Sequence, residues 1–151
     1  MTGPRPTRHA EVRLRPATSD DVDHVVDLKS RVLRADLERL VGWDDGRSRA
    51  RVLEHFSPRH THMIVVGADT AGTITLRPEG DLVWPEMFYL DERFQGRGIG
   101  TIVLTEVLAR ITAPVRLQVL VGSAAQRLYE RHGFVVDHDD GVDVWMCRPG
   151  S

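Results

Sequence analysis

The chain has 151 residues, 41% of them hydrophobic, and a formal net charge of -2, a size that suits one globular domain with an ordinary core. The near balance of 20 basic and 22 acidic residues argues against a dedicated nucleic-acid binder, which needs a concentrated positive surface. There is no apolar run near the ~20 residues of a membrane span and no signal-peptide core, so we expect a cytoplasmic protein without membrane contact.

The N-terminal end is expected to contribute little to the fold. Residues 1–10 include prolines and a glycine without an apolar period, which predicts a disordered tail. Residues 11–149 are then expected to form a single domain. This domain opens with a short strand, because Val12 and Leu14 alternate with arginines.

Two helices are predicted next. Apolar residues recur at helical spacing between Val22 and Leu40, so the first helix is expected to span about residues 20–41. Glycines flank a Trp-Asp-Asp turn after it, and a shorter second helix is expected to stop before Pro58.

The pattern then changes to strands separated by short turns. The expected strands are 63–66, 73–76 and 82–90, with turns at 69–72 and 77–81. Turns this short imply antiparallel neighbours.

The strand that ends at Leu90 leads into the most informative segment, a loop containing Gly96, Gly98 and Gly100 that opens a helical pattern. A glycine-rich turn at a helix N-terminus aims unpaired N–H groups at one point under the positive end of the helix dipole, which favours phosphate. The spacing differs from the dinucleotide fingerprint, which needs its third glycine at Thr101, and from a P-loop, which needs Gly-Lys-Ser/Thr. A tight turn without a ligand is the alternative interpretation.

The sequence pattern in the last third of the chain predicts two helices and three strands. The helix after the glycines ends at Pro114, and the strand that follows can lie parallel to the one before the glycines because a helix intervenes. Ser123 caps a further helix that stops at Gly133, and a hairpin of residues 134–136 and 142–146 closes the chain. The fold class is α/β (α+β), a mixed, mostly antiparallel sheet of about seven strands with helices on both faces, in the order β-α-α-β-β-β-α-β-α-β-β.

Two motifs, at residues 95–100 and 125–134, resemble those of the GNAT superfamily of acetyl-CoA-dependent N-acetyltransferases. The first matches the family's Q/R-x-x-G-x-G/A pyrophosphate loop, and the second matches its A-x-x-L-Y-x-x-x-G-F stretch. The element order extends the resemblance over about residues 12–146. Many members carry an asparagine seven residues before the tyrosine; this chain has Gly122 there, so that contact is missing or falls to Ser123.

The resemblance implies acetyl-CoA as the cofactor. The main chain of residues 88–90 would pair with its pantetheine arm, and the loop N–H groups would bind its pyrophosphate. Arg97 would add a phosphate contact, with a solvated surface arginine as the alternative. The implied cofactor-binding residues are Phe88, Tyr89, Leu90, Gln95, Gly96, Arg97, Gly98, Ile99, Gly100, Thr101, Ser123 and Ala125.

Acetyl transfer to an amine needs a group that takes the amine proton and a group that stabilises the departing thiolate. By the resemblance, Tyr129 would direct its hydroxyl toward the thioester sulfur; simple packing on the sheet is the alternative. Glu86 is the carboxylate candidate for the base, and an ordinary strand-surface glutamate is its alternative. Regular alternation would place Glu86 on one face with Trp84 and Phe88, unless a bulge at the neighbouring proline changes the parity.

The acceptor pocket is expected around Trp43, Asp44 and Asp45, with Trp84 across from them, because an aromatic ring beside carboxylates suits a cationic amine. A capped turn that closes over the core is the alternative. We expect no metal, because the histidines between residues 55 and 62 have no carboxylate or cysteine arranged with them.

The sequence therefore predicts an N-acetyltransferase that moves an acetyl group from acetyl-CoA to a primary amine by direct attack in a ternary complex. The expected partner is a small-molecule or peptide amine acceptor, and the family resemblance adds a homodimer through the C-terminal strands. Two other functions stay open: a non-catalytic acyl-CoA-binding or regulatory module of the same fold, and a nucleotide-binding domain that uses the same loop.

Overall fold

The computed structural model describes residues 11–151, so the predicted tail over residues 1–10 lies outside the described residues. The elements are β1 (Val12–Pro16), η1 (Ser19–Asp21), α1 (Val22–Leu40), α2 (Asp45–His55), β2 (Thr61–Val66), β3 (Asp69–Glu79), β4 (Leu82–Leu90), η2 (Glu92–Phe94), α3 (Ile99–Ala109), β5 (Val115–Leu120), α4 (Ala124–Arg131), β6 (Val135–Asp139) and β7 (Asp143–Arg148). The predicted order of strands and helices is confirmed.

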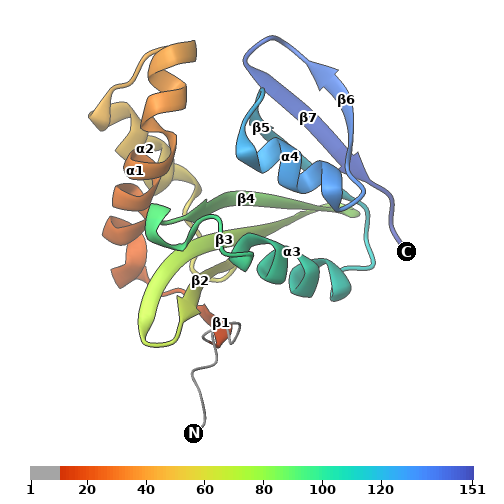
Figure 1. Ribbon diagram of the computed structural model, residues 1–151, viewed down its shortest axis with the longest axis horizontal. Coiled ribbons are helices and arrows are strands. Elements are labelled where there is room, and N and C mark those ends of the chain that lie inside the picture. Colours follow the sequence, from red (N-terminus) through yellow and green to blue (C-terminus); the bar gives the residue numbers. More distant parts are fainter. Residues whose placement is uncertain (1–10) are drawn as a thin grey trace, which may run out of the picture.

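The strands form one seven-stranded sheet in the order β1-β2-β3-β4-β5-β7-β6 (Figure 1). Every neighbouring pair is antiparallel except β4 and β5, which are parallel. The mixed, mostly antiparallel sheet is therefore confirmed, as is the parallel strand after the glycine loop.

Helices cover both faces of the sheet. On one face, Val25 and Leu28 of α1 pack with Met63 of β2, and α2 lies beside α1 (Figure 1). On the other face, Val103 of α3 packs with Ile64 of β2, while α4 and α3 together cover β5 and β7. Among the described residues, none of the helices combines the length and the apolar character that a bilayer crossing would require.

The predicted turn at residues 69–72 is wrong. The β2–β3 hairpin turns at Gly67 and Ala68, because Val66 pairs directly with Asp69. Gly67 has a φ of +61°, which a side chain would strain. The glycine that suggested a turn at residue 72 instead lies inside β3.

Gly72 marks a close approach of two strands. It pairs with Leu90, and a Cβ on it would lie 2.2 Å from the carbonyl oxygen of Tyr89. The next predicted turn, at residues 77–81, is also too long: Glu79 pairs with Leu82 across a two-residue turn. β3 is therefore longer than the predicted strand 73–76, whereas β4 has the predicted bounds.

The sheet is nearly divided between β4 and β5. Their register contains one pair, Val83 with Val115, where the Val83 N–H donates to the carbonyl oxygen of Pro114 at 3.1 Å. Beyond this pair the two strands separate toward the C-terminal end of β4, while β4 remains paired with β3 as far as Leu90. A wedge therefore opens in the sheet beside the glycine loop.

Candidate active site

The glycine loop presents a row of unpaired backbone donors at the N-terminus of α3. Gly96 and Gly98 have φ values of +73° and +78°, and no atom lies within 4 Å of the position that a Cβ would occupy on either. Within residues 11–151, the N–H groups from Gly96 to Thr101 form no intramolecular hydrogen bond. The loop therefore has the free donors and the open space that an anion needs.

One part of the loop expectation needs correction. The N–H of Gln95 donates to the carbonyl oxygen of Glu92 at 3.2 Å, so it is not a free donor. The Gln95 side chain also donates to the carbonyl oxygen of Leu90 at 2.8 Å, which braces the loop against the end of β4. Gly100 has another role, because its Cβ position lies 3.3 Å from Leu128 and the glycine lets α3 pack closely on α4.

A buried carboxylate fixes the start of the loop. Asp91 accepts a hydrogen bond from the N–H of Arg93 and pairs with the guanidinium of Arg31 on α1. Burial alone would raise the pKa of Asp91, but the Arg93 and Arg31 contacts outweigh it, and the pKa is lowered. Arg31 and Asp91 thus tie the loop to the opposite layer of the fold.

The Arg97 side chain is directed toward the residues that precede it in the loop. Its guanidinium donates to the carbonyl oxygen of Arg93 at 3.1 Å and lies over the ring of Phe94, 5.3 Å from its centroid. The side chain is exposed, so this geometry agrees with the surface-arginine alternative as well as with an arginine that could turn toward a bound phosphate.

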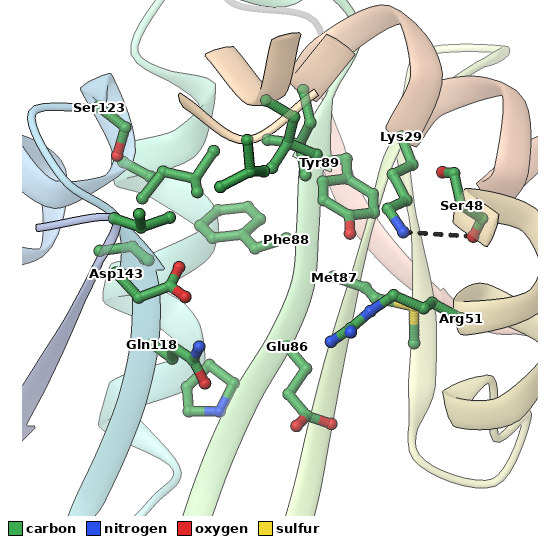
Figure 2. Close-up of a pocket in the computed structure, with 18 of the residues that line it drawn as sticks. Lys29, Ser48, Arg51, Glu86, Met87, Phe88, Tyr89, Gln118, Ser123 and Asp143 are labelled. Atoms are coloured by element: carbon green, nitrogen blue, oxygen red, sulfur yellow. Dashed lines mark hydrogen bonds between the residues drawn. The ribbon is translucent and has the colours of Figure 1, made fainter. Parts of the chain in front are cut away.

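The wedge opens into a cavity of about 790 Å³ that joins the glycine-loop side of β4 to the space under α1 and α2. Figure 2 shows side chains entering it from both sides, with Phe88 and Tyr89 on the central strand. Most of the predicted site residues outside the glycine loop line this cavity; they are Trp43, Asp44, Trp84, Glu86, Phe88, Tyr89, Ser123, Ala125 and Tyr129.

Tyr129 is buried at the wall of the cavity, with 2% of its surface exposed. Its ring packs edge-on against Phe88 and Phe134, at centroid distances of 6.4 and 5.2 Å. Burial raises the pKa of the Tyr129 hydroxyl above its ordinary value. The phenol is therefore neutral at physiological pH and can act as a hydrogen-bond donor.

Glu86 lies on a different face from the one that regular alternation predicts. Thr75 pairs with Glu86 and Thr73 pairs with Tyr89. The pairing therefore advances by three residues on β4 but by only two residues on β3. The extra residue forms a bulge at Met87, whose φ is +48°. Glu86 and Tyr89 consequently share the α1 face of the sheet, and the expectation that Glu86 shares a face with Phe88 is wrong.

The carboxylate of Glu86 is held by an arginine from the neighbouring strand. Nε and Nη2 of Arg77 donate to its two oxygens at 3.0 and 3.1 Å. Arg77 also binds Glu79 and lies 5.5 Å from the ring centroid of Trp84. These contacts fix the orientation of the Glu86 carboxylate, which lines the cavity.

The turn before α2 has the capped geometry of the alternative interpretation. Asp44 is the N-cap of α2 and accepts from the N–H of Arg47 at 2.7 Å, while Nε1 of Trp43 donates to Asp45 at 2.6 Å. Trp43 and Asp44 nonetheless line the same cavity as Trp84, whose buried Nε1 has no hydrogen-bond partner. The three residues thus line one cavity, although Asp44 already caps α2.

A family model described as the acetyltransferase (GNAT) domain matches residues 58–136, which is more than half of the chain. The chain belongs to the GNAT acetyltransferase family. This match contains the glycine loop, the wedge and the whole of α4.

Solved structures agree with the GNAT fold over nearly the whole chain. A protein from Pyrococcus horikoshii has a TM-score of 0.74 at 20% identity, covering 93% of this chain and 99% of that chain. The PaiA N-acetyltransferase from Thermoplasma acidophilum, solved in complex with coenzyme A, has a TM-score of 0.71 at 15% identity, covering 92% and 99%. A ribosomal-protein alanine N-acetyltransferase from Escherichia coli has a TM-score of 0.70 at 17% identity, covering 93% and 95%. Comparison with functionally curated proteins finds no significant match.

The departure from the GNAT asparagine has a backbone explanation. Gly122 has a φ of +72°, in the left-handed region that asparagine tolerates better than most residues and glycine adopts freely. Its N–H is bound by the Gln126 side chain at 2.7 Å, and Ser123 caps α4 by accepting from the N–H of Gln126. One lone pair of the Ser123 hydroxyl is thus used by the helix cap.

The sequence reasoning missed several polar residues of the cavity, among them Ser48 and Arg77. Lys29 and Arg51 enter it from α1 and α2, and Gln118 and Asp143 enter it from β5 and β7 (Figure 2). No motif contains them, and only the position of Lys29 as the sole lysine of the chain distinguished any of them in the sequence. Within the described part of the chain, no group of histidine, cysteine and carboxylate residues is arranged to hold a metal ion.

Proposed function

We propose that this GNAT protein is an acetyl-CoA-dependent N-acetyltransferase that acts on a primary amine by direct attack in a ternary complex. The observation that carries the proposal is the row of free N–H groups from Gly96 to Thr101, placed at the helix N-terminus beside the open wedge. Such donors favour a pyrophosphate. Residues 11–149 would act as one acetyltransferase domain, because all the strands belong to one sheet.

The wedge suits the arm of coenzyme A. Beyond Val83, β4 has no strand partner on the β5 side, so its main chain there can bind an amide-bearing arm as an added strand would. The contacts would come from residues 88–90, and the carbonyl of Leu90 also accepts a hydrogen bond from the Gln95 side chain. Acetyl-CoA supplies an acetyl thioester, whose carbonyl carbon the amine attacks as the C–N bond forms and the C–S bond breaks.

Tyr129 would donate a hydrogen bond to the sulfur as negative charge develops on it. An ordinary phenol is already a slightly weaker acid than an alkyl thiol, and burial raises the Tyr129 pKa further. Its role is therefore that of a neutral donor whose contact strengthens in the transition state.

The acceptor must be neutral to attack. A free alkylamine with a pKa of ~10.4 is uncharged in only about one molecule in a thousand at neutral pH. Glu86 faces the cavity, and each of its oxygens keeps a second lone pair beside its Arg77 contact, so it can accept the amine proton directly or through water.

The acceptor would be a small molecule or a peptide that enters between Trp43 and Trp84. A homodimer through the C-terminal strands also remains a proposal. It is supported by β6, an edge strand whose Val135 is 60% exposed and whose Val136 is 44% exposed.

Calorimetry with coenzyme A, followed by thiol release from acetyl-CoA with a panel of amines, tests the proposal. We expect coenzyme A to bind, ATP to compete poorly, and thiol release to depend on the amine. Binding without any amine-dependent release would indicate the non-catalytic module instead. Equal competition by ATP would indicate a nucleotide-binding domain.

A further inference from the structure

Basic side chains gather at the end of the cavity beneath α1 and α2, and no step of the proposed transfer uses them. Lys29 on α1 and Arg51 on α2 both line this end. In Figure 2 the Lys29 ammonium and the Arg51 guanidinium both point toward the space between the Tyr89 hydroxyl and Glu86. Two cations thus face the region where an acceptor would lie.

Lys29 is a buried charge with little to compensate it. The residue is 7% exposed, and its Nζ donates one hydrogen bond, at 3.2 Å, to the carbonyl oxygen of Ser48. Burial lowers the pKa of Lys29, and the nearby charge of Arg51 lowers it further. Buried ammonium groups are costly unless they are paired, so this position works against stability.

Neither cation has a carboxylate partner. Across residues 11–151, no Asp or Glu oxygen lies within 4.0 Å of the charged nitrogens of Lys29 or Arg51. Glu86 lines the same space, but its two oxygens are bound by Arg77, which also binds Glu79. Arg51 is exposed to solvent whereas Lys29 is buried, so Lys29 is the charge that a bound anion would chiefly compensate.

The role of Lys29 is not that of a helix cap. Ser48 lies inside α2, away from the helix end where carbonyl groups lack partners. The Ser48 hydroxyl is itself buried without a hydrogen-bond partner, on a residue that is 7% exposed and lines the same cavity. A buried ammonium and a buried unpaired hydroxyl together indicate a site that a polar ligand completes.

We propose that Lys29 and Arg51, with Ser48, bind an anionic group of the acceptor, so that the acceptor is an amine that also carries a carboxylate or a phosphate. The inference rests on the proposed function, because it names the acceptor class of that reaction. The anion would sit under α1 and α2, and the amine would point toward the acetyl group in the wedge. An uncharged amine would leave the two cations unmatched.

Matched acceptors test the proposal. The ω-amino acids glycine, β-alanine and γ-aminobutyrate are compared with ethanolamine, 3-aminopropanol and 4-aminobutanol, which keep the amine and lose the carboxylate. Phosphoethanolamine beside ethanolamine distinguishes a phosphate from a carboxylate. We expect kcat/KM to be about tenfold or more higher for the best anionic acceptor than for its alcohol, as charge-assisted hydrogen bonds require.

Variants assign this preference to the two cations. Arg51→Gln and Lys29→Met should each bring the ratio of anionic to neutral acceptor close to one, chiefly by raising KM for the anionic acceptor. Arg59→Gln removes an exposed arginine that does not line the cavity and should keep the wild-type ratio. Lys29→Met should not lower Tm, because the variant removes a buried charge. An equal loss with both acceptors together with a lower Tm would show that Lys29 is structural, and would overturn the proposal.

A binding measurement separates this inference from the proposed function. Because Lys29 is the only lysine of the chain, protein labelled with ¹³C-lysine gives a single side-chain ε signal in NMR spectra. β-Alanine should shift this signal and 3-aminopropanol should not. A shift without any acetylation would uphold the anion site while the proposed function fails. Acetylation of acids and alcohols at equal rates, with no shift of the Lys29 signal, would overturn the anion site and leave the proposed function standing.

Discussion

The two ends of the candidate active site are built in different ways. The loop end consists of consecutive residues, from Gly96 to Thr101, and its donors are backbone N–H groups fixed by glycine geometry and by the start of α3. The proposed acceptor end is the cavity, which is lined by side chains from α1, α2, β3 and β4 that meet only in the folded chain. A site made of backbone can be recognised in a short motif, whereas a site made of side chains depends on packing.

This difference suggests a division of tasks. The loop end has few side chains to vary, so it suits a ligand group that is the same for every member of a family. The acceptor end has charged and aromatic side chains that can change without disturbing the loop. Mutations at the two ends should therefore separate cofactor binding from acceptor choice.

The largest effect is expected at the loop. Gly98→Val places a β-branched residue at a φ of +78°, which costs about 1–3 kcal/mol and disturbs the free donors. We expect the Kd for coenzyme A, measured by calorimetry, to rise about 10- to 100-fold.

Gly141→Val is the matched control for this change. It strains a positive φ of +90° in the β6–β7 turn, far from the loop in sequence and outside the cavity lining. An equal rise of Kd in both variants would show that general strain, rather than the loop geometry, limits binding.

The second-largest effect is expected at Tyr129, which lies at the wall of the cavity. Tyr129→Phe keeps the edge-on contacts with Phe88 and Phe134 and removes only the hydroxyl. We expect kcat to fall about 10- to 100-fold, with little change in KM for acetyl-CoA, because one transition-state hydrogen bond is lost. A fall of less than about threefold at saturating substrate would exclude Tyr129 from stabilising the leaving group.

The smallest effect is expected where the loop is tied to α1. Asp91→Asn should lower the free energy of unfolding by about 1 kcal/mol at pH 7, because a buried, charge-assisted contact weakens and its Arg31 partner is partly exposed. Asp27→Asn is the control, since Asp27 binds the same arginine from an exposed position and should have less effect. Urea denaturation measures both.

The pH dependence of this contact has a definite sign. The pKa of Asp91 is lower in the folded chain than its ordinary value, so its contribution is complete above about pH 4 and is lost as the pH falls through the lowered pKa. The difference between wild type and Asp91→Asn should therefore shrink in acid. A difference that stays constant down to about pH 2 would contradict this assignment.

Sequence patterns predicted the parts of the molecule that depend on near neighbours. Apolar periodicity and glycine spacing identified the order of elements and the loop, and Ser123 caps α4 as predicted. A bulge that changes the parity of β4 was left open at Pro85, and its actual place at Met87 was not predicted, because it depends on the pairing with β3. The same applies to Gly72, whose turn-like identity reflects a contact with Tyr89 across the sheet.

The acceptor end could not be predicted for the same physical reason. Lys29 and Arg51 lie on separate helices, and their convergence depends on how α1 and α2 pack on β4. A lysine within an amphipathic helix is ordinarily placed on the solvent side. Only the folded structure shows that this one is buried.

The division of the sheet also has a consequence for folding cooperativity. One residue pair joins β4 to β5, so hydrogen bonds between strands do little to couple the β1–β4 half to the β5–β7 half. Helix α3 provides the connection, since Val103 packs into the first half and Leu104 into the second. The two halves should therefore unfold together only while α3 is docked, and a ligand that adds a strand between them would make the protein a single cooperative unit.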